Sequence, residues 1–209
     1  MPDQKTLPSE LAAKLRRDIL SGKIAPGVRL TEIFFSEKYA VSRTPVREAL
    51  RELGNEQLIK LLPNRGAVVV GLSKADIRDL YQIREQLEVQ AARWAAVRFE
   101  QEELEAIEQT LEFMEFYTRR KDAGRIRELG VIFHQNIRDA AHNRQLCREL
   151  TLYHTYLNES KHTRRIAAAD LDAIYSEHAM IFEAIASSDA DAGSCAMQLH
   201  IQNAQLRAL

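Results

Sequence analysis

All five prolines of this 209-residue chain lie at or before Pro63, and the rest of the chain contains none. Proline breaks a helix because it has no N–H to donate and its ring collides with the preceding turn. The long proline-free part can therefore be helical throughout. The sequence predicts six helices there, over residues 73–99, 101–120, 122–141, 144–166, 170–187 and 189–208.

Residues 41–51 predict a helix with one buried face and one basic face. Apolar residues recur every three or four positions, and Arg43 and Arg47 point to the opposite side. We expect Thr44 to be the N-cap and Pro45 the first helical residue, where a missing N–H costs nothing. An exposed helix start with arginines four residues apart suits the DNA major groove, where Arg binds guanine O6 and N7. The alternative is an ordinary solvated basic face.

The position of this helix in the chain favours the DNA-binding interpretation. Two more helices are predicted upstream and a two-stranded hairpin downstream, over residues 10–21, 31–39, 58–62 and 67–70. The turn of the hairpin carries Arg65 at its tip. Three helices and a hairpin make a winged helix-turn-helix. We therefore predict a winged helix-turn-helix domain over residues 1–71 and an all-helical six-helix bundle over residues 72–209.

Three runs in the first domain, Ile19–Glu32, Val41–Leu50 and Pro63–Gly66, resemble the N-terminal domain of GntR-family bacterial transcription regulators. The resemblance implies binding to an operator as a dimer. It also implies a set of DNA-contacting residues on the basic helix and the wing, namely Arg43, Thr44, Arg47, Asn64, Arg65 and Gly66.

The chain departs from this family pattern at three places. Ala40 and Gln57 stand where many members have glycine, and Ile33 stands where a polar residue or arginine is common. We expect a tighter or more helical turn at Ala40 and the loss of one base contact at Ile33. Neither change removes the arginines of the basic helix.

Scattered positions in the second half, at 79–88, 133–134, 143, 177–185 and 197–200, resemble the FCD effector domain of GntR regulators of the FadR subfamily. Six predicted helices place the domain with the shorter, VanR-like members. The resemblance implies that this bundle senses a small molecule, and it favours an organic carboxylate.

Three of the six histidines, His134, His178 and His200, lie on the apolar faces of three different predicted helices. Three inward imidazoles suit a metal such as Zn²⁺ or Ni²⁺. The resemblance implies a fourth ligand, an aspartate one turn before the first histidine, but Gly130 occupies that place. The site would then have open positions for water or an anionic effector. The alternative is a metal-free pocket that is uncharged or binds an anion. His142, His154 and His162 have no comparable setting.

Arg84 and Glu88 lie four residues apart inside the inward stripe of the first bundle helix. Two buried charges must be paired with each other or serve a ligand. One interpretation is an internal ion pair. In the other, which the family resemblance favours, Arg84 binds the carboxylate of the effector. The two are compatible if Glu88 orients Arg84.

Charge is divided between the two predicted domains, with +4 for residues 1–70 and −5 for residues 71–209. The basic domain is the one expected to face DNA. The chain has only two cysteines, and we find neither a signal peptide nor an apolar run long enough to cross a membrane. We therefore expect a cytoplasmic protein with reduced thiols and no membrane partner.

The predicted function is that of a homodimeric, ligand-responsive transcription regulator that is not an enzyme. A three-histidine metal-dependent hydrolytic enzyme with a nucleic-acid-binding head is the competing hypothesis, because an open metal site can activate water. No inward Glu, Asp or Cys stands out as its catalytic partner. A nonspecific architectural DNA protein is a third hypothesis, which the formal net charge of −1 disfavours.

Overall fold

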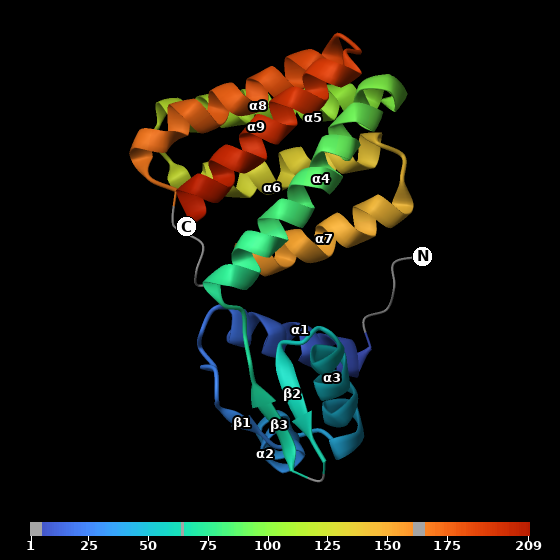
Figure 1. The fold of residues 1–209 in the computed structure, drawn as a ribbon, viewed down its shortest axis with the longest axis vertical. Helices are drawn as coiled ribbons and strands as arrows, with labels where there is room; N and C mark the ends of the chain where they lie inside the picture. The colour runs from blue at the N-terminus through green and yellow to red at the C-terminus, as the bar shows by residue number, and fades with distance from the viewer. Residues whose placement is uncertain (1–5, 64, 161–165) are drawn as a thin grey trace. The chain divides into compact units, whose positions relative to one another are not determined.

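A computed structural model describes residues 6–63, 65–160 and 166–209 of the chain. The chain divides into two compact units, and the main division falls between Ala75 and Asp76. Figure 1 shows a small unit that contains the sheet and a larger unit built of helices. The mainly helical fold class is confirmed.

The small unit is a winged helix-turn-helix. Its helices and strands follow in the order α1 (Leu7–Leu20), β1 (Arg29–Leu30), α2 (Glu32–Tyr39), α3 (Arg43–Asn55), β2 (Ile59–Leu62) and β3 (Gly66–Val69). The three strands form an antiparallel sheet in the order β1-β3-β2, and Leu62 pairs with Gly66 at the tip of the hairpin. The sequence predicted this hairpin but not β1, whose two residues are too short for a strand pattern.

The predicted start of the basic helix is wrong by two residues. Helix α3 has Ser42 as its N-cap and begins at Arg43, so Thr44 is already helical and Pro45 is the third helical residue. Proline is tolerated there because the N–H groups of the first helical turn have no intrahelical acceptor.

The apolar stripe of α3 packs on α1. Val46, Ala49 and Leu53 are fully buried, as is Leu15 of α1. Burial of this stripe directs the opposite, arginine-bearing face of α3 away from the core. The predicted division of this helix into a buried face and a basic face is present in the structure.

The turn after α2 differs from the expectation. Ala40 ends the helix in the left-handed conformation, with φ 53° and ψ 43°, and does not form a tighter helical turn. Gln57 also has a positive φ, of 60°. Both residues therefore adopt the backbone conformation for which glycine is preferred, although neither is glycine.

The larger unit holds the six predicted helices. They are α4 (Lys74–Arg98), α5 (Gln101–Arg119), α6 (Ala123–Ala140), α7 (Arg144–Glu159), α8 (Leu171–Ala186) and α9 (Ala190–Ala208), with a short 3₁₀ helix, η1 (Ala168–Asp170), before α8. Helix α5 packs against α6 and α8, and α8 packs against α9. Helix α7 ends earlier than the predicted Ile166, because its apolar stripe stops at Leu157.

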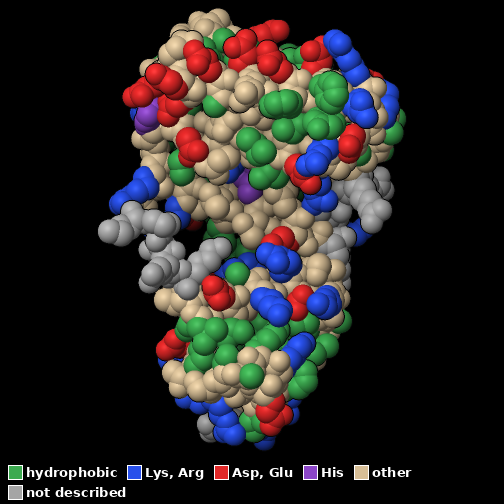
Figure 2. All heavy atoms as spheres, turned by 180° about the vertical axis from the view of Figure 1, so that it is seen from behind, with side chains coloured by type: hydrophobic (Ala, Val, Ile, Leu, Met, Phe, Trp, Pro, Cys, Tyr) green, Lys and Arg blue, Asp and Glu red, His purple; other side chains and the backbone are tan. Residues whose placement is uncertain are grey.

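Large apolar side chains such as Phe133, Met114 and Ile181 fill the centre of the bundle. Charged side chains and histidines from five helices are buried there as well, and they form the site described below. Among the described residues, no helix is long and apolar enough to cross a membrane. On the face shown in Figure 2, acidic side chains gather over one end of the bundle.

Candidate functional sites

The first site is a groove of the winged unit that brings five arginines together. They come from β1, α3 and the wing, and they are Arg29, Arg43, Arg47, Arg51 and Arg65. The predicted DNA contacts Arg43, Arg47, Arg65 and Gly66 all line this groove. Thr44 is exposed at the start of α3 but does not line it, and Asn64 lies outside the described residues. A groove with this charge can attract a polyanion.

Arg47 is held by a residue that the sequence analysis did not single out. Its Nε donates to Glu32 Oε1 and its Nη2 to Glu32 Oε2, both at 2.7 Å. The hydrogen bond from Arg47 is the main reason why the pKa of Glu32 is lowered. These two bonds do not use the N–H groups of Nη1. Arginine N–H groups of this kind can bind guanine.

Gly66 has a structural role in the wing. Its φ is +80°, and a Cβ added there would lie 2.2 Å from the carbonyl oxygen of Leu30. No side chain fits in that space. Gly66 therefore lets β3 approach β1 closely, whether or not its backbone also touches DNA.

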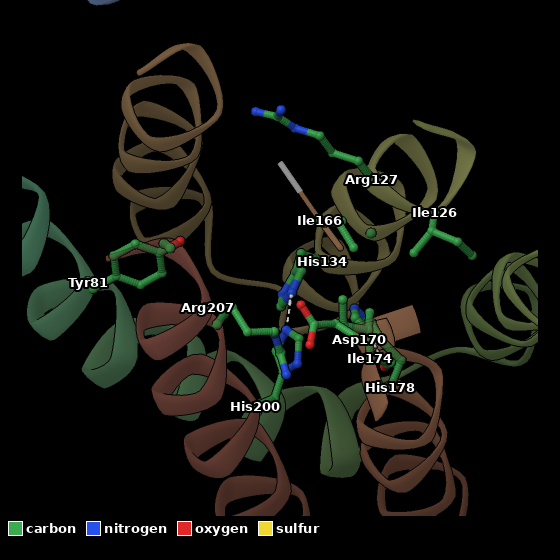
Figure 3. Close-up of a pocket in the computed structure, with 13 residues that line it drawn as sticks. Tyr81, Ile126, Arg127, His134, Ile166, Asp170, Ile174, His178, His200 and Arg207 are labelled. Carbon is green, nitrogen blue, oxygen red and sulfur yellow. Dashed lines mark hydrogen bonds between the residues drawn. The ribbon is translucent and has the colours of Figure 1, made fainter. Parts of the chain in front are cut away.

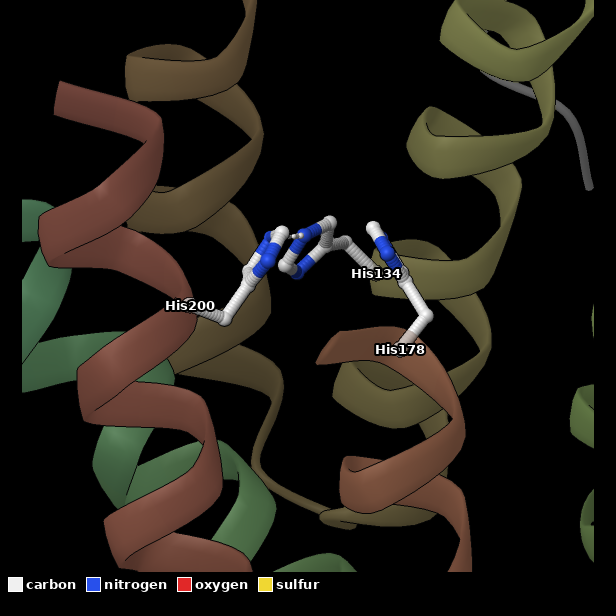
Figure 4. Close-up of side chains that lie close together, drawn as sticks. All are labelled: His134, His178 and His200. Atoms are coloured by element: carbon white, nitrogen blue, oxygen red, sulfur yellow. Dashed lines mark hydrogen bonds between the residues drawn. The ribbon is translucent and has the colours of Figure 1, made fainter. Parts of the chain in front are cut away.

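The second site is a cluster of histidines inside the bundle. His134 of α6, His178 of α8 and His200 of α9 are 4%, 2% and 4% exposed. Figure 4 shows the three imidazoles facing one another between their helices. One ring nitrogen from each lies within 4.8 Å of the others, a spacing that can hold a metal ion. The structure thus brings together the three histidines that the sequence predicted.

The outer nitrogen of each imidazole faces an acceptor. His178 Nδ1 donates to the carbonyl of Ile174 at 2.7 Å, and His200 Nδ1 donates to Glu177 Oε2 at 2.8 Å. His134 Nδ1 lies 3.3 Å from Glu88 Oε2. Acceptors placed in this way keep the proton on Nδ1 and leave the Nε2 lone pair for a metal.

The inner nitrogens converge, and Arg84 Nη2, which lies 3.4 Å from His134 Nε2, offers a donor to one of them. His134 Nε2 lies 3.1 Å from His200 Nε2, and His178 Nε2 has no hydrogen-bond partner in the described part of the chain. If His134 and His200 both carry their protons on Nδ1, two lone pairs face each other at this distance. If His134 is protonated on Nε2 instead, its Nδ1 lone pair faces the Glu88 carboxylate. A cation bound to the Nε2 atoms resolves this conflict.

Burial keeps these imidazoles neutral. It lowers the pKa of His134 and of His178 to about 3 and that of His200 to about 4. A neutral imidazole is the form that binds a metal. The site is therefore in its ligating form at neutral pH.

A cavity of about 150 Å³ adjoins the histidines (Figure 3). Gly130 lines it, and a Cβ added there would meet only His178 Nε2, at 3.9 Å. The charged residues Arg127, Asp170 and Arg207 also line the cavity. The place where the family resemblance implied a carboxylate ligand is thus open space beside the histidines.

Arg84 and Glu88 form the internal ion pair that the sequence allowed. Arg84 Nε donates to Glu88 Oε1 at 3.2 Å, and the two residues are 7% and 0% exposed. Arg84 does not line the cavity, but its Nη2 lies 3.4 Å from His134 Nε2. Arg84, which the sequence suggested as the effector-binding residue, therefore contacts the histidine cluster and not the cavity.

His154 is also buried beside the histidine cluster, contrary to the expectation from the sequence. This residue of α7 is 6% exposed, and its Nε2 donates to Glu88 Oε1. It continues the apolar stripe of Leu146 and Leu150 at a spacing of four, a signal that was present in the sequence. His142, by contrast, is exposed and bonds to Glu103, and His162 lies outside the described residues.

Two other buried residues of the site were missed. Glu177 of α8 accepts bonds from His200, from Asn203 and from both Nη atoms of Arg207. Arg138 of α6 is 2% exposed and its Nη1 lies 4.0 Å from Glu88 Oε1. Neither residue stands out in sequence, because charged residues usually lie on the solvated face of a helix.

Comparison with known families matches a family model to each of the two units. Residues 7–69 match the gntR family of bacterial regulatory proteins, and residues 79–203 match the FCD domain. The chain belongs to the GntR family. It is a transcription regulator with an N-terminal DNA-binding domain and an FCD effector-binding domain, as the sequence analysis predicted.

Curated relatives carry related names. The chain is 31% identical over 188 residues to the HTH-type transcriptional repressor RspR of Escherichia coli, a match that covers 90% of this chain and 82% of that protein. It is 36% identical over 128 residues to the gluconate operon transcriptional repressor of Bacillus subtilis, which covers 61% and 52% of the two chains. The enzyme hypothesis finds no support among these relatives.

Solved structures share the fold. E. coli McbR/YncC superposes with a TM-score of 0.70 at 21% identity, over 95% of this chain and 94% of that chain. A GntR family member from Pseudomonas syringae superposes with a TM-score of 0.53 at 26% identity, over 99% and 86% of the two chains.

Proposed function

We propose that this regulator binds its operator as a homodimer through the arginine groove, and that its bundle senses a small organic carboxylate through a divalent metal. His134, His178 and His200 would hold the metal. The observation that carries the metal proposal is the convergence of their Nε2 atoms while each Nδ1 faces an acceptor. When bound, the metal supplies a Lewis acid with coordination positions open to a carboxylate.

The residues of the chain have separate tasks in this proposal. Glu88 and Glu177 orient two of the histidines, and the backbone of Ile174 orients the third. The opening at Gly130 leaves room for a ligand beside His178. Glu88 also belongs to α4, the first helix after the wing, so a change at His134 reaches the helix that leads to the DNA-binding unit.

The effect of the carboxylate on DNA binding would be a shift between two arrangements of the dimer. A ligand changes this equilibrium only by as much as it binds the two arrangements differently. Two winged units held together gain affinity for an operator with two half-sites, because the second contact becomes intramolecular.

Native mass spectrometry of the full chain, with elemental analysis, tests both parts of the proposal. We expect a dimer with one divalent transition metal per subunit. His178→Ala should lose the metal, and the control His142→Ala should keep it, because His142 is exposed and bonds to Glu103 instead. A wild-type protein without metal after purification and metal addition would refute the metal site. A monomer would refute the dimer.

On the DNA side, we propose that Arg43 and Arg47 contact bases, and that Arg65, with neighbouring wing residues, contacts phosphates. The groove that these arginines line supports this division, since α3 carries the first two and the wing carries the third. Footprinting on a selected operator, with wild type and single alanine variants, tests it. Loss of the footprint is expected for the α3 variants.

A further inference from the structure

The charged side chains around the histidines do not balance. Two carboxylates, Glu88 and Glu177, lie among three guanidinium groups, those of Arg84, Arg138 and Arg207. Each carboxylate accepts hydrogen bonds from an arginine and from an imidazole, and the remaining Glu88 oxygen, Oε2, lies 3.3 Å from His134 Nδ1. With neutral imidazoles, these five side chains carry one positive charge in excess, and the Arg207 side chain among them is 22% exposed.

The partly exposed residues at the cavity do not remove the excess. Arg127 and Asp170 carry opposite charges and cancel each other. Arg138 is poorly paired, since its Nε and Nη1 have no hydrogen-bond partner within the described ranges and its Nη1 lies 4.0 Å from Glu88 Oε1. Burial also lowers the pKa of this guanidinium, although Glu88 opposes the effect.

A metal held only by imidazoles makes this imbalance larger. Imidazole brings no negative charge, so a divalent ion adds its full charge to an interior that is already positive. Arg84 Nη2 lies 3.4 Å from His134 Nε2, which is one of the atoms that the metal would take. The guanidinium and the metal would repel each other at close range in a poorly solvated site.

The structure has room for a compensating anion beside the ligands. Gly130 has no side chain to fill the adjoining cavity, and the direction of its missing Cβ leads to His178 Nε2. A carboxylate that enters this space from solution can bind the metal and offset its charge.

We infer that the metal and an anion bind to this chain as a pair, so that each raises the affinity for the other. The effector then supplies the negative charge that no residue at position 130 provides. This inference rests on the proposed metal site and adds to it. The coupling is reciprocal, so a metal-free protein should also bind the anion weakly.

Metal titration of the chelator-treated, full-length protein tests the inference. The metal is Co²⁺, whose absorption bands report binding, and the probe anion is acetate, which binds free Co²⁺ weakly. The buffer contains no carboxylate or other coordinating anion. We expect acetate to raise the affinity for Co²⁺ by about tenfold or more, within the usual range of coupling between two sites.

Two variants at one position separate charge from size. Gly130→Asp should bind Co²⁺ tightly without acetate and should gain little from it, because the carboxylate is then built in. Gly130→Asn has nearly the same size and no charge, and it should keep the dependence on acetate. Gly130 lies inside α6 and does not have a positive φ, so both side chains are compatible with the helix.

The outcomes are distinct. Equal Co²⁺ affinity of the wild type with and without acetate would overturn the inference and leave the metal site intact. Equal behaviour of the Asp and Asn variants would overturn it as well. Absence of Co²⁺ binding in the wild type and in Gly130→Asp, with and without acetate, would overturn both the inference and the proposed metal site.

Discussion

The two units of this protein use the same residue type in opposite ways. In the winged unit, Arg43, Arg47 and Arg51 are exposed on one helix and line an open groove. In the bundle, Arg84 and Arg138 are 7% and 2% exposed and lie against Glu88. An exposed guanidinium stays solvated and is free to meet phosphates or bases. A buried guanidinium needs a carboxylate partner. Where buried carboxylates are too few, the uncompensated positive charge favours binding of an anionic ligand.

Two Arg–Glu pairs make the difference concrete. Arg47 and Glu32 form two bonds of 2.7 Å, yet the Arg47 side chain is 53% exposed. Arg84 and Glu88 are joined by a longer bond, of 3.2 Å, in a buried site. Geometry alone would rank the exposed pair as the stronger one. The cost of removing one partner follows the opposite order, because water can solvate the charge left behind at the exposed pair but not at the buried pair.

Removing the carboxylate from each pair should give the largest contrast. Glu88→Gln should lower the free energy of unfolding by about 3–5 kcal/mol, because it leaves two buried guanidinium groups without a counter-charge. The control, Glu32→Gln, should change it by less than about 1 kcal/mol. Urea unfolding of the two metal-free variants measures both values. Similar small losses for both would show that Glu88 does not hold the buried cluster together.

For DNA binding, in contrast to stability, substitutions in the winged unit should have the larger effect. Arg47→Ala should cost about 1–3 kcal/mol of specific operator binding if Arg47 binds a guanine. Arg65→Ala should weaken binding to all sequences alike if the wing touches mainly phosphates. Fluorescence titrations with operator and random DNA measure the two effects. An equal loss on both DNAs for Arg47→Ala would contradict its role in reading bases.

Acid should weaken the bundle before it weakens the winged unit. Burial lowers the pKa of His134 and His178 to about 3 and that of His154 and His200 to about 4. In the unfolded chain these residues take up protons near pH 6.5, so the unfolded state binds more protons below that pH. Stability of the metal-free protein should therefore fall as the pH is lowered from 6.5 toward 4, by up to about 1.4 kcal/mol per pH unit for each histidine.

Unfolding of the metal-free protein at pH 7 and at pH 5, followed by circular dichroism, checks this expectation. The pKa values of Glu88 and Glu177 are also lowered in the folded protein. As the pH falls further, these carboxylates take up protons in the unfolded chain before they do so in the folded protein, which lowers stability again. Equal stability at the two pH values would show that the histidines are not buried as neutral groups.

The smallest expected effect concerns the backbone of the winged unit. Ala40 has a φ of 53° at the end of α2, where glycine has no steric penalty. Ala40→Gly should raise the free energy of unfolding by up to about 1 kcal/mol, since relief of strain exceeds the added flexibility of the unfolded chain. Thermal unfolding against the control Ala25→Gly measures this change. A destabilised Ala40→Gly protein would mean that the left-handed turn carries little strain.

Local patterns in the sequence determined a large part of this molecule. The spacing of Val46, Ala49 and Leu53 predicted which face of α3 is buried, and therefore which face carries arginine. The same kind of spacing placed His134, His178 and His200 inside the bundle. The Arg84–Glu88 pair was foreseen because residues four apart on a helix are neighbours. Each of these relations lies within one helix, where the helical period decides which side chains share a face.

Only the tertiary structure decided which helices face each other and what their polar residues touch. Glu32 lies 15 positions from Arg47, and Glu88 lies 66 positions from His154. Helical periodicity predicts that His154 points inward, but it does not predict that the Glu88 carboxylate lies beside it. The charge imbalance around the histidines has the same origin, because it is a sum over helices α4, α6, α8 and α9. The energy of a buried charge depends on all the groups around it, and those groups are assembled only when the helices pack.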